Sequence, residues 1–184
     1  MQVHTEMSVP CELEAVSEDE ISEEIYYAAA GLEGVTAATV VWDIEKTAVI
    51  EEYTCALTVY GLDSSYLAGE WLAGNAFPDR SNMVYAVINK AAAQSFRNQH
   101  DSRLTITVPE NWISEACHFD DDRNTPVRIC GVIDDEASEA RAYVSISQIR
   151  SLRMDLNLES PCKVLWLRLK DVSFRESAVS RLSQ

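Results

Sequence analysis

The residues from Cys117 to Asp122 have the types and the spacing that could do chemistry. A thiol beside the imidazole of His118 can supply a nucleophile and its base, and the three carboxylates of Asp120–Asp122 could bind a divalent cation. Neighbouring loop residues point in different directions, however, and the run lacks the alternate-position ligands and the glycine of a calcium loop. We therefore expect a solvated acidic loop with no catalytic residue and no metal. An enzyme that uses this loop is the third of three hypotheses.

No other chemical motif stands out in the sequence. None of the six glycines falls in a phosphate-binding GxGxxG or GxxxxGKS/T pattern, and HExxH and GxSxG are absent. The five cysteines lack the short spacings of a zinc site or a disulfide framework, so we predict reduced core thiols and no cofactor. These cysteines are Cys11, Cys55, Cys117, Cys130 and Cys162.

Composition and hydropathy predict a cytoplasmic globular protein. Hydrophobic residues make up 47% of the chain and charged residues 24%, which argues against disorder. No apolar run reaches the roughly 18 residues of a transmembrane helix, and the N-terminus lacks the basic and apolar regions of a signal peptide. Unpaired cysteines fit a reducing compartment. We expect no contact with a membrane.

The distribution of charge gives the main functional lead. The formal net charge is −15. Residues 1–79 contain 16 acidic residues and a single base, Lys46, so they account for all of it, whereas residues 80–184 contain 14 residues of each sign. Such an asymmetry informs about partners rather than about the fold.

We hypothesise that the N-terminal carboxylates form a binding face. A favourable interaction with the helix dipole explains the acidic residues of the first helical turn. It does not explain the acidic residues elsewhere or the near absence of basic residues. The protein would then be an inhibitor that docks on a basic surface of another protein, such as a nucleic-acid-binding groove, and would not bind nucleic acid itself. Its composition resembles that of phage anti-defence and immunity proteins. The predicted partner-binding residues are Glu6, Glu12, Glu14, Glu18, Asp19, Glu20, Glu23, Glu24, Glu51 and Glu52.

The alternative is a structural or accessory protein that assembles with copies of itself. Residues 141–184 carry eight bases against four acids, so the basic C-terminal portion of one copy could meet the acidic portion of another. The bases concerned are Arg141, Arg150, Arg153, Lys163, Arg168 and Lys170.

The N-terminal stretch is predicted to fold as a strand followed by a helix. Apolar and polar residues alternate over Val3–Ala15, as in a strand with one buried face. Ser17–Glu20 has the pattern of a capping box, and apolar residues then follow at helical spacing to Leu32. Gly31 or Gly34 can end this helix.

Two helices are predicted in the middle of the chain. Asp63 can cap a short helix that runs to about Ala73. The strongest helical pattern covers Ser81–Asn98, because its apolar residues form one broad stripe. We expect that stripe to bury Val84, Val87, Ile88 and Ala91.

The remaining segments read mainly as strands. β-Branched and alternating residues predict strands over 35–43, 46–60, 103–108 and 162–172. Residues 127–133 and 140–147 are expected to pair as a hairpin, followed by a short helix to Arg153.

These elements predict an α+β fold, with a mixed and largely antiparallel sheet covered by helices and organised as one domain or two small lobes. We place an acidic strand–helix–strand–strand lobe at residues 1–76, and a lobe of a helix plus antiparallel strands at 77–174. A polar tail follows at 175–184.

Overall fold

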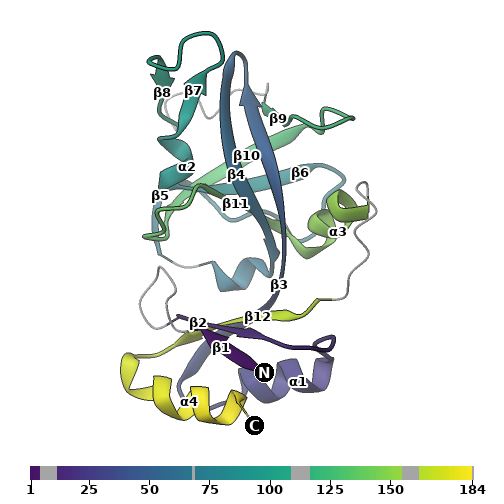
Figure 1. Cartoon of the computed structure of the whole chain (residues 1–184), viewed down its shortest axis with the longest axis vertical. Coiled ribbons are helices and arrows are strands. Elements are labelled where there is room, and N and C mark those ends of the chain that lie inside the picture. The colour runs from purple at the N-terminus through teal and green to yellow at the C-terminus, as the bar shows by residue number, and fades with distance from the viewer. Residues whose placement is uncertain (5–11, 68, 109–116, 155–161, 184) are drawn as a thin grey trace.

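The structure is a computed structural model that describes residues 1–4, 12–67, 69–108, 117–154 and 162–183 (Figure 1). The mixed sheet agrees with the predicted α+β class, with 45% of the described residues in strands and 22% in helices. The sheet is larger than expected and the helices are fewer.

Twelve strands make up the sheet within the described residues, in the order β1-β2-β12-β3-β4-β11-β6-β10-β5, with β7 beside β4 and β8, and β9 beside β3. The pairs β4–β11 and β6–β10 are parallel. The strands are β1 (Gln2–His4), β2 (Glu12–Val16), β3 (Val35–Ile50), β4 (Tyr53–Leu62), β5 (Glu70–Gly74), β6 (Val84–Asn89), β7 (Phe96–Asn98), β8 (Thr105–Ile106), β9 (Cys117–Phe119), β10 (Val127–Asp134), β11 (Arg141–Ser145) and β12 (Val164–Leu169).

The helices are short and lie at the margins of the sheet. The helix α1 begins after Ser22, whose side chain accepts a hydrogen bond from the backbone N–H of Ile25. It ends at Gly31, one of the two glycines predicted to end it. The α-helices are α1 (Glu23–Ala30), α2 (Lys90–Ala93), α3 (Ile146–Met154) and α4 (Arg175–Leu182), and the 3-10 turns are η1 (Ser64–Tyr66) and η2 (Val172–Phe174).

The long strand β3 links the two ends of the molecule. Its first half, up to Val41, pairs with β12, and its second half, from Trp42, pairs with β4. Figure 1 shows β1, β2, β12, α1 and α4 gathered at one end of β3, while the tip of the β3–β4 hairpin lies at the other. The two ends of the chain therefore lie in the same part of the molecule. The division into residues 1–76 and 77–174 remains a prediction, although β12 and α4 pack with the N-terminal elements.

Three groups of buried residues fill the interior. One lies under α1 and α4, around Leu13 and Leu165. A larger one lies in the part of the sheet that contains β4, β6, β10 and β11, around Val59 and Phe96. The third lies where these two parts meet. It consists of Val41, Leu62, Tyr66, Phe77, Val87, Ile133, Tyr143 and Trp166.

The helix predicted over Ser81–Asn98 is wrong. The segment forms β6, then the single turn α2, then β7. Val84, Val87 and Ile88 are buried as expected, at 7%, 0% and 2% exposure. The physical reason is that β6 lies between β10 and β11, and a strand buried on both faces carries a continuous apolar run that resembles a helical stripe.

Other local predictions also failed for non-local reasons. The strand expected over Val3–Ala15 is two antiparallel strands, β1 and β2, and residues 5–11 between them lie outside the described part. Ser17 forms a turn with Asp19 instead of capping the helix. Asp63 caps only the turn η1, after which the chain forms β5.

The two strands predicted to form a hairpin do exist, but they are not neighbours. The strand β6 lies between β10 and β11. The break predicted between the strands over 35–43 and 46–60 also lies further along the chain, because β3 continues without interruption to Ile50. The polar C-terminal tail forms the helix α4, whose Ala178 is 2% exposed.

Candidate functional site

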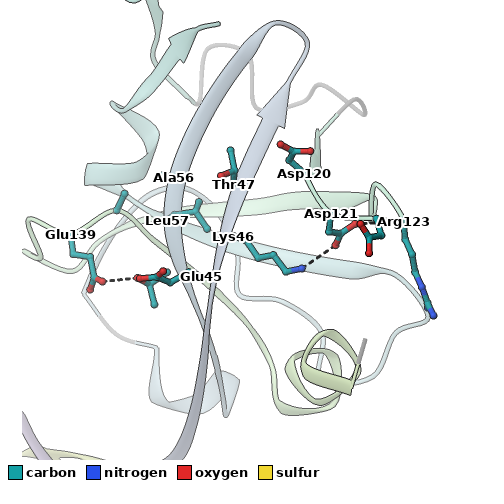
Figure 2. Close-up of a pocket in the computed structure, with 12 residues that line it drawn as sticks. Glu45, Lys46, Thr47, Ala56, Leu57, Asp120, Asp121, Arg123 and Glu139 are labelled. Carbon is teal, nitrogen blue, oxygen red and sulfur yellow. Dashed lines mark hydrogen bonds and ion pairs between the residues drawn. The ribbon is translucent and has the colours of Figure 1, made fainter. Parts of the chain in front are cut away.

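A groove of about 780 Å³ runs beside the β3–β4 hairpin and is lined by both acidic and basic side chains (Figure 2). The strands β3 and β4 supply its floor, and the turn after β9 and the residues before β11 supply its walls. The groove is lined by Glu45, Lys46, Thr47, Ala56, Leu57, Thr58, Asp120, Asp121, Asp122, Arg123, Glu139 and Ala140.

Lys46 and Asp121 form an ion pair inside this groove. Their side chains are 6% and 13% exposed, and Lys46 Nζ lies 3.2 Å from Asp121 Oδ2 (Figure 2). Asp121 also accepts hydrogen bonds from the backbone N–H and the hydroxyl of Thr125, at 3.0 and 2.8 Å. Burial tends to raise the pKa of Asp121, but the bonds from Thr125 and the charge of Lys46 lower it overall. The carboxylate therefore anchors the turn after β9.

Glu139 is held in the same way at the opposite wall. Its carboxylate accepts hydrogen bonds from Thr58 Oγ1 at 2.7 Å, Tyr60 Oη at 3.1 Å and Arg141 Nε at 2.9 Å. Burial tends to raise the pKa of Glu139, and these three donors together lower it below its usual value. Glu45, Asp120 and Asp122 are exposed at the rim, so the groove attracts positively charged or hydrogen-bond-donating groups.

The stretch Cys117–Asp122 does not form a catalytic constellation. Cys117 and Phe119 point into the core, and only Asp120–Asp122 line the groove. Burial raises the pKa of the Cys117 thiol to about 12, so it carries no thiolate near neutral pH. Within the described ranges, no group of three or more His, Cys, Asp or Glu residues could hold a metal ion.

The predicted acidic face is spread over the molecule. Glu18, Asp19 and Glu20 are exposed before α1, and Glu23 and Glu24 are exposed in its first turn. Glu51 and Glu52 form the exposed turn of the β3–β4 hairpin, at the far end of the molecule from α1 (Figure 1). Glu6 lies outside the described residues.

Two of the predicted carboxylates are used within the chain. Glu12 is 4% exposed and accepts a hydrogen bond from Arg168 Nη2 at 2.8 Å. Glu14 accepts a hydrogen bond from Trp166 Nε1 at 2.9 Å. Burial raises the pKa of Glu12, although the bond and the charge of Arg168 oppose this.

Several of the C-terminal bases are likewise engaged inside the chain. Arg141 lies over the rings of Tyr60 and Trp166, at 5.1 and 5.8 Å from their centres. Arg150 lies 4.8 Å from the ring centre of Trp42, and Arg153 donates to the carbonyl of Asp43 at 2.7 Å. Lys163 and Lys170 are exposed.

Sequence reasoning missed the polar cluster at the junction of the two parts of the molecule. Arg168 Nη1 donates to the carbonyl of Tyr66 at 2.6 Å, and its guanidinium lies 4.5 Å from the ring centre of Tyr66. On the side of β11, the hydroxyl of Tyr143 donates to the carboxylate of Asp135, which is 7% exposed. No sequence signal could have found this cluster, because these four residues come from four separate segments.

No protein-family model matches this sequence, and no curated protein matches it. Solved structures do resemble it. The extracellular domain of the noncanonic ABC-type transporter YknZ from Gram-positive bacteria is 14% identical with a TM-score of 0.56, over 92% of this chain and 90% of that one. The periplasmic region of MacB from Actinobacillus actinomycetemcomitans is 14% identical with a TM-score of 0.59, over 94% of this chain and 81% of that one.

These comparisons contradict the functional hypothesis drawn from charge. A fold shared with extracellular and periplasmic domains of transporters conflicts with a cytoplasmic location, with the absence of any membrane contact, and with an anti-defence inhibitor that docks on a basic surface. The hypothesis failed because net charge describes solubility and steering, whereas the fold depends on strand pairing. Among the described helices, none has the length and apolarity needed to cross a bilayer. The chain thus shares the fold of extracytoplasmic transporter domains.

Proposed function

We propose that this chain works outside the cytoplasm as a non-enzymatic domain of an ABC-type transporter assembly. The observation that carries the proposal is the fold shared with the domains of YknZ and MacB over 92% and 94% of this chain. The likeness covers 90% and 81% of those two structures, so it concerns a whole domain rather than one common motif.

The arrangement of the chain supports this proposal. Both ends lie beside α1 and α4, and the β3–β4 hairpin extends to the opposite end (Figure 1). A domain attached through both ends to a membrane component would project away from it in this way. The finer organisation that we propose is two small lobes joined by β3, since one group of buried residues lies at each end of that strand.

The chemistry of the groove supports a contact surface rather than an active site. Lys46, Asp121 and Glu139 are each fixed by partners within the chain, so they need little ordering when another component binds. Away from the groove, the thiols of Cys55 and Cys130 lie in surroundings that raise their pKa to about 11, which makes them poor nucleophiles. We propose that the groove is a surface on which another part of the assembly rests.

A labelling experiment in intact cells of the native host tests the location. Ser102 is exposed in a turn before β8, and Ser145 is 4% exposed in β11, so Ser102→Cys and Ser145→Cys make the same substitution at an open and a closed position. A maleimide that cannot cross the cytoplasmic membrane should label Ser102→Cys in intact cells. Ser145→Cys and the wild-type chain report the background.

Labelling of Ser102→Cys only after cell lysis would refute the extracytoplasmic location. A second measurement concerns the assembly: after crosslinking and extraction in detergent, the chain should purify together with an ATP-binding subunit of an ABC-type transporter. Recovery without any such subunit, while the labelling succeeds, would retain the location and reject the assembly.

A further inference from the structure

Three side chains in contact lead from the groove to the junction between the two parts of the molecule. Glu139 lines the groove and accepts a hydrogen bond from Arg141, whose guanidinium lies over the ring of Trp166. The side chain of Glu139 is 45% exposed and that of Arg141 is 12% exposed, while Trp166 is 3% exposed. The series therefore begins at the solvent and ends inside the buried junction.

Arg141 makes contacts in both directions along this series. Its Nε donates to Glu139 Oε2 at 2.9 Å, a charge-assisted bond that fixes the plane of the guanidinium. The same guanidinium lies over Tyr60 and Trp166, whose ring centres are 4.8 Å apart. A cation over an aromatic face is attracted more strongly where water is excluded. The position of the guanidinium and the surroundings of the indole therefore depend on each other.

The contact between Arg141 and Trp166 joins different parts of the sheet. Arg141 belongs to β11, which lies between β4 and β6. Trp166 belongs to β12, which lies between β2 and β3, and its Nε1 donates to Glu14 of β2 at 2.9 Å. A displacement of Arg141 would therefore change the surroundings of a residue in the other part of the molecule.

Tyr60 offers a second route between the same two residues. Its hydroxyl donates to Glu139 Oε2 at 3.1 Å, and its ring contacts that of Trp166. Loss of the Glu139 carboxylate would remove only a neutral bond from Tyr60, whereas it would leave the charge of Arg141 without its counter-charge at 12% exposure. A charge left in such surroundings is strongly unfavourable, so the guanidinium must seek another partner. Arg141 is therefore the residue expected to move.

We infer that Arg141 couples the groove to the junction. A group that binds the carboxylate of Glu139 in the groove competes with Arg141 for it, and the guanidinium then shifts relative to the ring of Trp166. Because coupling between two sites is reciprocal, a change at the junction alters the affinity of the groove to the same extent. The coupling is a property of this chain alone and does not depend on which component rests in the groove.

Nuclear magnetic resonance of the whole chain labelled with ¹⁵N-tryptophan tests the coupling. Glu139→Gln removes the charge and retains the shape of the side chain, and it should move the indole N–H resonance of Trp166. The resonance is assigned by its loss in Trp166→Phe. Glu45→Gln is the matched control, because Glu45 is another exposed carboxylate of the groove, and it should leave the resonance in place. An unmoved Trp166 resonance in Glu139→Gln would overturn the inference.

Two further backgrounds separate the routes. In Arg141→Met, which lacks the charge, Glu139→Gln should no longer move the Trp166 resonance. In Tyr60→Phe, which retains the ring and lacks the hydroxyl, Glu139→Gln should still move it. The opposite pattern would assign the coupling to Tyr60 and refute the role of Arg141. A movement that persists in both backgrounds would be a direct effect of the lost charge and would refute that role as well.

A measurement of unfolding decides the question if Arg141→Met does not fold. The effect of Glu139→Gln combined with Trp166→Phe on the unfolding equilibrium constant should differ from the product of the two single effects by about twofold or more, as for residues within one network. Glu45→Gln combined with Trp166→Phe should give the simple product. Simple products for both pairs would show that the groove and the junction are independent.

Discussion

The ion pair between Glu12 and Arg168 gives the sharpest prediction about stability. The side chain of Glu12 is 5% exposed and that of Arg168 is 18% exposed, and Glu12 Oε1 lies 2.8 Å from Arg168 Nη2. Arg168→Met keeps much of the aliphatic volume and removes the charge. It leaves Glu12 buried without its partner, and it also removes the bond to the carbonyl of Tyr66.

The expected loss of unfolding free energy is about 3–5 kcal/mol, the usual cost of leaving one buried charge uncompensated. That is a large share of the roughly 5–15 kcal/mol by which domains are stable. The double variant Glu12→Gln with Arg168→Met should recover much of the loss, because no buried charge then remains without a partner.

The loss should depend on pH in a defined direction. Burial already raises the pKa of Glu12 above its usual 4.5, and removing Arg168 removes the two largest opposing influences. A carboxyl whose pKa is higher in the folded state than in the unfolded state binds its proton more tightly when folded. The stability of Arg168→Met should therefore approach that of the wild-type chain near and below pH 4.5 and fall relative to it as the pH rises.

Urea unfolding followed by tryptophan fluorescence measures these differences, since Trp166 lies in the same cluster. Arg103→Met is the matched control, because Arg103 is 89% exposed in its pair with Asp101 and its loss should leave stability unchanged. A loss below about 1 kcal/mol in Arg168→Met, or a loss that does not change between pH 4 and pH 7, would refute the reasoning.

Three further predictions concern the core. Val87→Asp should cost about 3–5 kcal/mol in urea unfolding because Val87 is 0% exposed, whereas Met83→Asp, at 41% exposure, should cost little; equal effects would contradict the burial of β6. Gly61→Ala should cost about 1–3 kcal/mol in thermal unfolding, since its Cβ would lie 2.0 Å from Ile149 Cγ2, and it should cost less in an Ile149→Ala background, which lacks Cγ1 and Cγ2. Cys55 and Cys117, with pKa values of about 11 and 12, should resist a thiol reagent at pH 8 and react on unfolding; fast reaction of either in the native protein would show that it is exposed.

Burial was largely readable from the sequence, and so were the helices α1 and α3 and several strands, whereas the segment Ser81–Asn98 was assigned to the wrong element. Leu13, Ala15 and Val87 were predicted to face the core, and each is 0% exposed. The thiols of Cys55, Cys117, Cys130 and Cys162 are free, as expected, and Cys11 lies outside the described residues. Hydrophobic residues avoid water whichever element carries them, so a local pattern reports burial more reliably than it reports helix or strand.

The segment Ser81–Asn98 shows why the element itself needed the tertiary structure. In isolation its apolar stripe favours a helix, but β10 and β11 provide hydrogen-bond partners on both edges of Val84–Asn89. The segment is more stable as a strand than as a helix only because it pairs with residues about 40 or more positions away in the sequence. The same kind of non-local contact separates β10 from β11, which the sequence suggested as neighbours.

The candidate sites depended still more on tertiary structure. The sequence by itself determined the α+β composition, the acidic N-terminal half and the absence of a recognisable catalytic motif. It could not show that Glu12 meets Arg168, which is 156 residues away, or that Lys46 meets Asp121, 75 residues away. A count of charges does not say which charges face solvent. That depends on which carboxylates form ion pairs within the chain, and these pairs form only where the fold brings distant strands together. The acidic surface therefore misled the functional hypothesis, and the pairing of strands around β3 revealed the likeness to transporter domains.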